Sequence, residues 1–160
     1  MDSAKLDLHP VLHYSKSHRR VIYDLRREPD TLMLRESDRS LLDNDTGHSV
    51  TRPPTNSMRI YYPRLPWYID IKADGVPYIS IEDFFLQLFA ALNQPISKPD
   101  FYNNILDDED RRVLNHAFRE RCRSEGEKME GVKRVDFLRG EIEWMGLIPG
   151  KEGMWRMKTG

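Results

Sequence analysis

Residues 80–92 decide the fold and read SIEDFFLQLFAAL. Apolar residues recur there at positions i, i+3, i+4 and i+7, the spacing that places them along one face of an α-helix. Ser80 can cap the free N–H groups at the start, and Asp83 stands at the third position of a capping-box pattern. Because the segment is apolar over most of its circumference, we expect the helix 81–92 to lie at the centre of the core.

Short segments rich in β-branched and aromatic residues lie on both sides of this helix. Residues 58–62 and 67–71 alternate between apolar and polar side chains, which is the pattern of half-buried strands. Asp74-Gly75 predicts a hairpin turn that leads to a further strand at 76–79. Other strands are expected at 21–25, 141–144 and 154–158.

An acidic run at 107–110 predicts the start of a second main helix, because negative charges stabilise the positive end of a helix dipole. A short helix is expected before it, from Ser97 to about Ile105. We therefore predict an α+β fold, with a small, mostly antiparallel sheet packed by two main helices, at about 81–92 and 108–124, plus a short one.

The chain of 160 residues has the length of one domain. We expect a flexible N-terminus at 1–8, followed by a single α+β domain at 9–160. Within that domain the chain turns polar at about 35–57, where aliphatic residues are sparse. A loop of this length is unusual in a compact domain, so it is expected to be an insertion or a lid.

Charge and cysteine content exclude several classes of protein. Lys and Arg total 25 against 26 Asp and Glu, and a net charge of −1 provides no broad field to attract nucleic acid or an anionic membrane. The single cysteine, Cys122, cannot form an internal disulfide. The first residues lack the apolar run of a signal peptide, and no segment approaches about 20 apolar residues. The expected compartment is the cytoplasm, with the nucleus as the alternative.

Three segments carry a resemblance to a known family. They are Leu65-Pro66-Trp67, the segment YISIED at 78–83, and the block GVKRVDFL at 131–138. Together they resemble a fungal, mainly basidiomycete, domain family of unknown function, and the resemblance extends from about His9 to Met157. It implies a single α+β domain in an intracellular fungal protein, and it brings no catalytic residues with it.

Motifs of catalysis and of metal binding are missing from the sequence. There is no glycine-rich phosphate loop, no Gly-x-Ser-x-Gly and no His-Glu-x-x-His. His9 and His13 have a helical spacing, but Pro10 lies between them and a metal site needs more ligands. His116 and Cys122 point to different faces of their helix, which excludes a nucleophilic pair. We predict no catalytic residues, no metal site and no cofactor.

Aromatic residues and arginines are the remaining candidates, because they are the usual anchors of binding surfaces. Tyr62, Arg64 and Tyr68 beside the break at 63–66 are expected to form an exposed cluster, and Arg134 stands two residues before Asp136 in the family-like block. The candidate binding residues are Tyr62, Arg64, Trp67, Tyr68, Arg134, Asp136 and Trp144.

These observations favour a non-catalytic intracellular binding domain. Its partner would be an unknown protein, a small ligand, or a second copy that forms a homodimer through an edge strand or an aromatic face; nucleic acid and membranes are not expected partners. The alternative is a small enzyme or small-molecule carrier, with a pocket between the sheet and the loop at 35–57. In that case Tyr23, Trp67, Arg134 or Asp136 would line the pocket.

Overall fold

The computed structural model describes residues 5–17, 19–34 and 47–160, and it confirms the α+β class. Helix α1 (Ile81–Leu92) has the predicted bounds. The hydroxyl of Ser80 accepts a hydrogen bond from the backbone N–H of Asp83 at 3.1 Å, so the predicted N-terminal cap is present.

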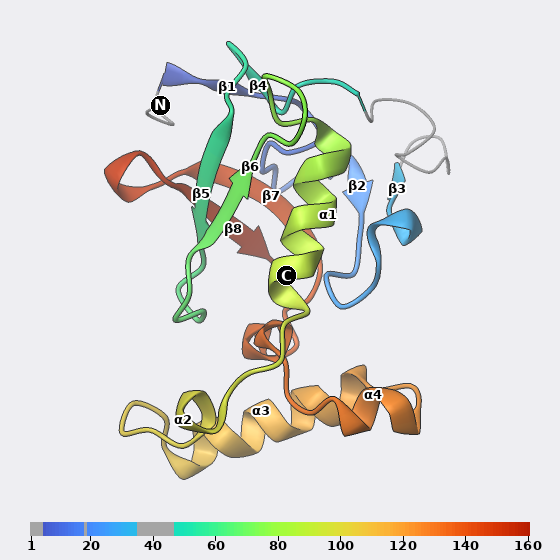
Figure 1. Cartoon of the computed structure of the whole chain (residues 1–160), viewed down its shortest axis with the longest axis vertical. Coiled ribbons are helices and arrows are strands. Elements are labelled where there is room, and N and C mark those ends of the chain that lie inside the picture. Colours follow the sequence, from blue (N-terminus) through green and yellow to red (C-terminus); the bar gives the residue numbers. More distant parts are fainter. Residues whose placement is uncertain (1–4, 18, 35–46) are drawn as a thin grey trace.

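Four strands form the main sheet in the order β6-β5-β8-β7. Their bounds are β5 (Ser57–Tyr61), β6 (Ile69–Lys72), β7 (Trp144–Pro149) and β8 (Trp155–Thr159). The β5–β6 and β7–β8 pairs are antiparallel, and β5–β8 is parallel. Helix α1 crosses one face of this sheet (Figure 1). Its Phe84 and Phe85 rings meet the buried Trp144 indole at centroid distances of 5.7 and 5.3 Å, and this aromatic cluster is the centre of the core.

The hairpin predicted at Asp74-Gly75 is not formed, because residues 76–79 are not a strand. Pro77 cannot donate to a ladder, and the N–H of Ile79 donates instead to the carbonyl of Thr55 at 3.0 Å. The outer edge of β6 is occupied by a side chain: the Gln87 amide accepts from the backbone N–H of Lys72 and donates to its carbonyl.

Two further sheets have two short strands each. Strand β1 (Asp7–Leu8) pairs with β4 (Thr51–Arg52), and β2 (Val21–Ile22) pairs with β3 (Met33–Leu34). Of the N-terminus predicted to be flexible over 1–8, residues 1–4 lie outside the described part of the chain, while Leu6 is buried and Asp7–Leu8 form β1. Of the polar loop predicted at 35–57, residues 35–46 lie outside the described part of the chain, and the rest contains β4 and the first residue of β5.

Helices α2 (Lys98–Phe101), α3 (Asp108–Arg121) and α4 (Glu125–Met129) gather beyond the end of α1 (Figure 1). Helix α3 ends at Arg121 rather than near 124, because Cys122 takes an extended backbone and Ser124 caps α4. α3 packs mainly against η4 (Arg134–Leu138). Two more 3₁₀ turns are η2 (Pro29–Thr31) and η5 (Lys151–Gly153).

The segments that lead into and out of this helical group run side by side. The N–H of Ile96 donates to the carbonyl of Val132 at 3.1 Å, and the N–H of Arg134 donates to the carbonyl of Gln94 at 3.0 Å. Pro95 and Lys133 form an antiparallel bridge between these two bonds. Residues 97–131 therefore leave and rejoin the rest of the fold at neighbouring points.

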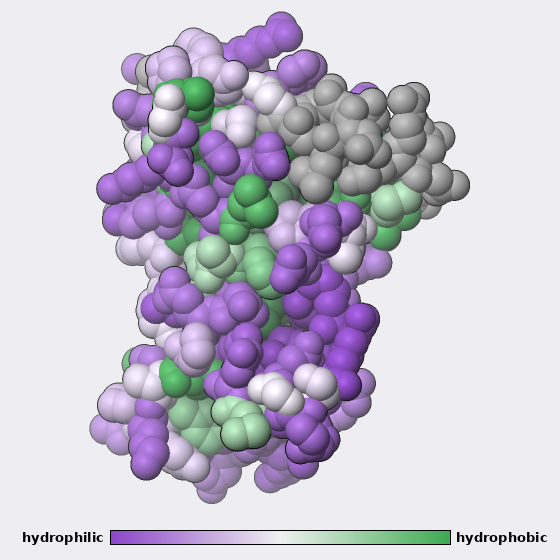
Figure 2. All heavy atoms as spheres, turned by 45° about the vertical axis from the view of Figure 1, so that its right-hand side comes forward, coloured by the Kyte–Doolittle hydropathy of each residue, from purple (hydrophilic) through white to green (hydrophobic). Residues whose placement is uncertain are grey.

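Hydrophilic side chains cover most of the face seen in Figure 2, and apolar atoms appear there only in small, separate areas. Within the described ranges, no helix combines the length and apolar character that crossing a membrane requires.

Candidate functional site

Trp67 and Arg134 come together at the contact between the sheet and η4. The guanidinium of Arg134 lies 4.6 Å from the Trp67 ring centroid, and the Phe137 ring contacts the Trp67 ring edge-on at a centroid distance of 5.0 Å. Trp67 lies in the connection between β5 and β6, so a cation–π pair joins that connection to η4. Both side chains are half-buried. The contact therefore has a structural role and is also partly accessible to a partner.

Tyr62 and Arg64 meet through a third residue, Glu141. The Tyr62 hydroxyl lies 3.3 Å from Glu141 and 2.8 Å from the Thr159 hydroxyl, and Arg64 lies 3.6 Å from the Glu141 carboxylate. Burial raises the pKa of Tyr62, and the nearby charge of Glu141 raises it further. The hydrogen bond with Thr159 lowers this pKa, but the net shift is upward. Tyr62 is buried, so only Arg64 of this pair belongs to an exposed surface.

Asp136 is buried, but its partner is Arg121 at the end of α3 and not the neighbouring Arg134. The Arg121 Nε and Nη2 donate to the two carboxylate oxygens at 2.8 and 3.0 Å, and the N–H of Lys133 donates to one of them at 2.8 Å. Burial alone would lower the pKa of Arg121, but the hydrogen bonds and charge of Asp136 outweigh it and raise that pKa. This pair fastens α3 to η4, which is a structural role.

The other two candidate residues lie apart from these groups. Tyr68 is half-exposed, and its ring receives the Arg59 guanidinium at 5.0 Å. Trp144 is 2% exposed between Phe84 and Phe85, so its indole belongs to the core and is not presented to a partner. The seven residues therefore do not form one site.

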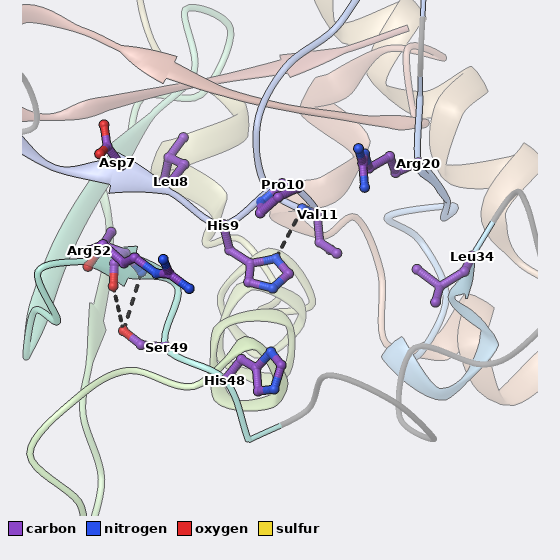
Figure 3. Close-up of a pocket in the computed structure, with 11 residues that line it drawn as sticks. Asp7, Leu8, His9, Pro10, Val11, Arg20, Leu34, His48, Ser49 and Arg52 are labelled. Atoms are coloured by element: carbon purple, nitrogen blue, oxygen red, sulfur yellow. Dashed lines mark hydrogen bonds between the residues drawn. The ribbon is translucent and has the colours of Figure 1, made fainter.

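A hollow of about 870 Å³, named here the basic hollow, opens at the other end of the molecule (Figure 3). Three separate segments supply its polar side chains: Asp7 and His9, then Arg20, and then His48, Ser49, Thr51 and Arg52. Leu8, Val11 and Leu34 add apolar surface. Its volume lies within the range of about 300–1,000 Å³ that is usual for small-molecule sites.

The backbone around the basic hollow is well anchored. β1 pairs with β4, so that Asp7 faces Arg52 across the strands. The N–H of His9 donates to the carbonyl of Val50 at 2.8 Å, and the carbonyl of His48 accepts from the N–H of Ile81 at 3.0 Å. The first turn of α1 thus holds one wall of the hollow.

Positive charge dominates this site. Neither Arg20 nor Arg52 has an ion-pair partner among the residues that the structure describes. Figure 3 shows the Arg52 side chain reaching toward His9, while the Asp7 carboxylate points away from it. Exposed guanidinium groups can bind the oxygens of phosphate or carboxylate groups in pairs.

The two imidazoles lie close together in the same hollow. The ring centroids of His9 and His48 are 5.8 Å apart, and the Nδ1 of His9 accepts a hydrogen bond from the N–H of Val11 at 3.2 Å. An accepting Nδ1 places the proton of a neutral imidazole on Nε2. No group of three or more metal-ligating side chains is found in the described ranges.

None of the four residues suggested for a pocket lines the basic hollow. Tyr23 is buried, and its hydroxyl donates to the carbonyl of Arg27 at 2.8 Å. Burial raises the pKa of Tyr23, and the charges of Asp24, Glu28 and Asp30 add to this effect. Trp67, Arg134 and Asp136 lie at η4, as described above.

The residues that do line the basic hollow were not among the candidates from the sequence. His9 was considered only as a metal ligand, and His48, Arg20 and Arg52 carry no local signal. Their meeting depends on β1, β4 and β3, which have two residues each and therefore no periodicity to detect.

Comparison with known proteins identifies a family. The model of a family described as "Family of unknown function (DUF6699)" matches residues 21–153. No curated protein and no solved structure matches the chain.

Proposed function

The chain belongs to the DUF6699 family of unknown function, and we propose that it is a non-catalytic binding domain that holds an anionic group in the basic hollow. The observation that carries this proposal is that Arg20 and Arg52 both line one hollow without an ion-pair partner among the described residues. Guanidinium groups present planar pairs of donors that match phosphate and carboxylate oxygens.

The dimensions and chemistry of the basic hollow support a ligand larger than a bare ion. A volume of about 870 Å³ exceeds what one phosphate fills, and Leu8, Val11 and Leu34 can contact an apolar or aromatic portion. Ser49 adds a hydroxyl, which is held in place by its hydrogen bond to the carbonyl of Thr51 at 2.9 Å.

Inorganic pyrophosphate is the probe for this proposal, titrated into the full chain while amide resonances are followed by NMR at matched ionic strength. We expect resonances near Val11, Ser49 and Arg52 to shift, with an affinity that falls as salt is added. Replacing both Arg20→Gln and Arg52→Gln should weaken binding at least tenfold, because each loses a charge-assisted contact. Arg119→Gln, at an exposed arginine of α3, is the matched control and should leave the affinity unchanged.

Both arginines are exposed, so the double variant should unfold at the same temperature as the parent chain. Binding that survives in the double variant, or shifts that fall outside the basic hollow, would overturn the proposal.

The pair of imidazoles favours a second candidate, a small enzyme that uses His9 and His48 for acid–base chemistry on a bound anion. Its test is hydrolysis of p-nitrophenyl phosphate by the parent chain and by a His9→Gln variant. Turnover that is lost in the variant would favour the enzyme, and no turnover in either protein would leave the binding domain as the better proposal.

We also propose that the protein is intracellular, that it is fungal and that it forms a homodimer. A single cysteine fits a reducing compartment, since the chain cannot form an internal disulfide. A homodimer that pairs two copies of β6 would have to displace Gln87 from Lys72. Sedimentation of the parent chain and of Gln87→Ala would show whether association depends on that edge.

A further inference from the structure

A second hollow, of about 310 Å³, lies between α3 and η4, and we call it the α3–η4 hollow. Val113, His116, Ala117 and Glu120 line it from one face of α3, at the spacing i, i+3, i+4 and i+7. Arg26 and Arg139 line it as well. None of these residues belongs to the basic hollow, so the two sites can be tested separately.

Both signs of charge face this hollow. The Arg26 guanidinium makes three hydrogen bonds to Asp24, which raise its pKa, and the charges of Glu120 and Asp136 add to this effect. Asp136 is already occupied by Arg121 and by the N–H of Lys133. Glu120 has no ion pair or hydrogen bond of its side chain with the other described residues. A guanidinium and an unpaired carboxylate thus stand at one hollow without bonding to each other.

Arg139 brings two unfavourable features to the same place. It is a non-glycine residue in the left-handed region, with φ 55° and ψ 44°, a conformation that side chains with a Cβ rarely adopt. Its Nη1 donates to Asp110 at 3.1 Å, whereas its Nε is buried and has no hydrogen-bond partner among the described residues. Strain and an unsatisfied donor at a residue that lines a cavity are typical of a ligand site.

The size and the walls limit the ligand. At about 30 Å³ for each water-sized group, 310 Å³ holds a molecule of roughly ten non-hydrogen atoms. Val113, Ala117 and Ile142 can contact an apolar body. A negative group would meet Arg139 and Arg26, and a positive group would meet Glu120.

We propose that the α3–η4 hollow binds a small apolar α-amino acid. The carboxylate takes the donors of Arg139 and Arg26, after a small rotation that brings the Nε of Arg139 to an acceptor. The ammonium group lies against Glu120, and the side chain packs on Val113, Ala117 and Ile142. A zwitterion suits this hollow better than a simple anion, because the unpaired Glu120 repels a second negative charge.

L-Leucine is the probe, and two molecules of the same shape are its controls. 4-Methylpentanoate lacks the ammonium group, and isopentylamine lacks the carboxylate. In an NMR titration of the full chain, leucine should shift resonances of Ala117, Val135 and Ile142, and both controls should bind about tenfold more weakly or less.

Three variants test the roles of the named residues. Glu120→Gln should remove the preference for leucine over 4-methylpentanoate, and Arg139→Asn, which tolerates the left-handed backbone, should remove the preference over isopentylamine. Ala117→Leu should fill the hollow and abolish binding while the chain stays folded. Arg119→Asn, on the same helix but outside the hollow, is the control.

Equal binding of the three molecules, or leucine binding that survives Ala117→Leu, would overturn the proposal. Pyrophosphate binding at the basic hollow should be unchanged in all three variants, so the failure of one proposal leaves the other intact.

Discussion

Arg121 and Asp136 form a two-point ion pair with side chains that are 4% and 1% exposed, and it fastens the last turn of α3 to η4. Among the described residues of α3, only Leu114 and Arg121 are buried, so this pair provides much of the attachment of the helix. Taking two charges out of water costs several kcal/mol per ion, and the pair must recover that cost through its geometry.

Asp136→Asn should lower the free energy of unfolding by about 3–5 kcal/mol, because it leaves the Arg121 charge buried without a partner. Urea denaturation measures the loss. The double variant Arg121→Met with Asp136→Leu should recover most of it, since two apolar side chains replace both charges. A loss below about 1 kcal/mol for Asp136→Asn would contradict the structural role.

Gly146→Ala should destabilise the fold by about 2 kcal/mol or more. Gly146 has φ 120°, and a Cβ there would lie 2.5 Å from the Cα of Tyr14, where the N-terminal segment runs beside β7. Thermal unfolding checks the effect. Gly47→Ala is the control and should unfold like the parent chain, because no described atom beyond its chain neighbours lies within 4 Å of a Cβ at that position.

Protonation of Asp24 should lower the stability of the fold in acid. Burial raises its pKa, but hydrogen bonds from Arg26 outweigh burial and the pKa is lowered overall. A lowered folded-state pKa gives stability that is present above the unfolded value of about 3.9 and is lost as pH falls through the folded value. Asp24→Asn should therefore flatten the decline of unfolding free energy between about pH 5 and pH 2.

The exposed Asp74 provides the comparison for that experiment. With Asp74→Asn, the unfolding free energy should fall more steeply as the pH is lowered than it does with Asp24→Asn. Identical profiles for the parent chain and Asp24→Asn would show that the Asp24–Arg26 contact does not stabilise the fold.

Trp67 and Arg134 should be energetically coupled. In a double-mutant cycle with Trp67→Leu and Arg134→Gln, we expect a coupling of about 0.5–1 kcal/mol in unfolding free energy, the usual strength of a cation–π contact. The same cycle with Arg119→Gln in place of Arg134→Gln should give additive effects. Additivity in both cycles would mean that the stacking adds no stability.

Local patterns predicted the parts of the fold that local physics determines. The cap at Ser80 and the apolar face of α1 both depend on residues a few positions apart, and both were predicted correctly. Asp74-Gly75 misled because the turn signal does not say whether the following segment finds a strand partner. The backbone of Ile79 instead forms hydrogen bonds with Thr55 and Val50.

The candidate sites were harder to predict, because their residues are far apart in sequence. Asp136 was a candidate binding residue, but its partner Arg121 lies fifteen residues before it and becomes its neighbour only when α4 reverses the chain. Trp144 was assigned to a surface because alternation alone does not say which face of a sheet α1 covers. Arg20 and Arg52 line the same hollow because of pairings between two-residue strands, which leave no pattern in the sequence.

The bridge between Pro95 and Lys133 makes residues 97–131 a topological insertion into a hairpin. A short turn could in principle join its two arms, and the sheet and α1 would keep every hydrogen bond that they make to each other. Such a shortened chain would still contain Asp136, whose counter-ion Arg121 is part of the insertion. The helical group can therefore be exchanged between related chains only together with the residue at position 136. Exchanging the helices alone would leave the buried carboxylate of Asp136 without a counter-ion.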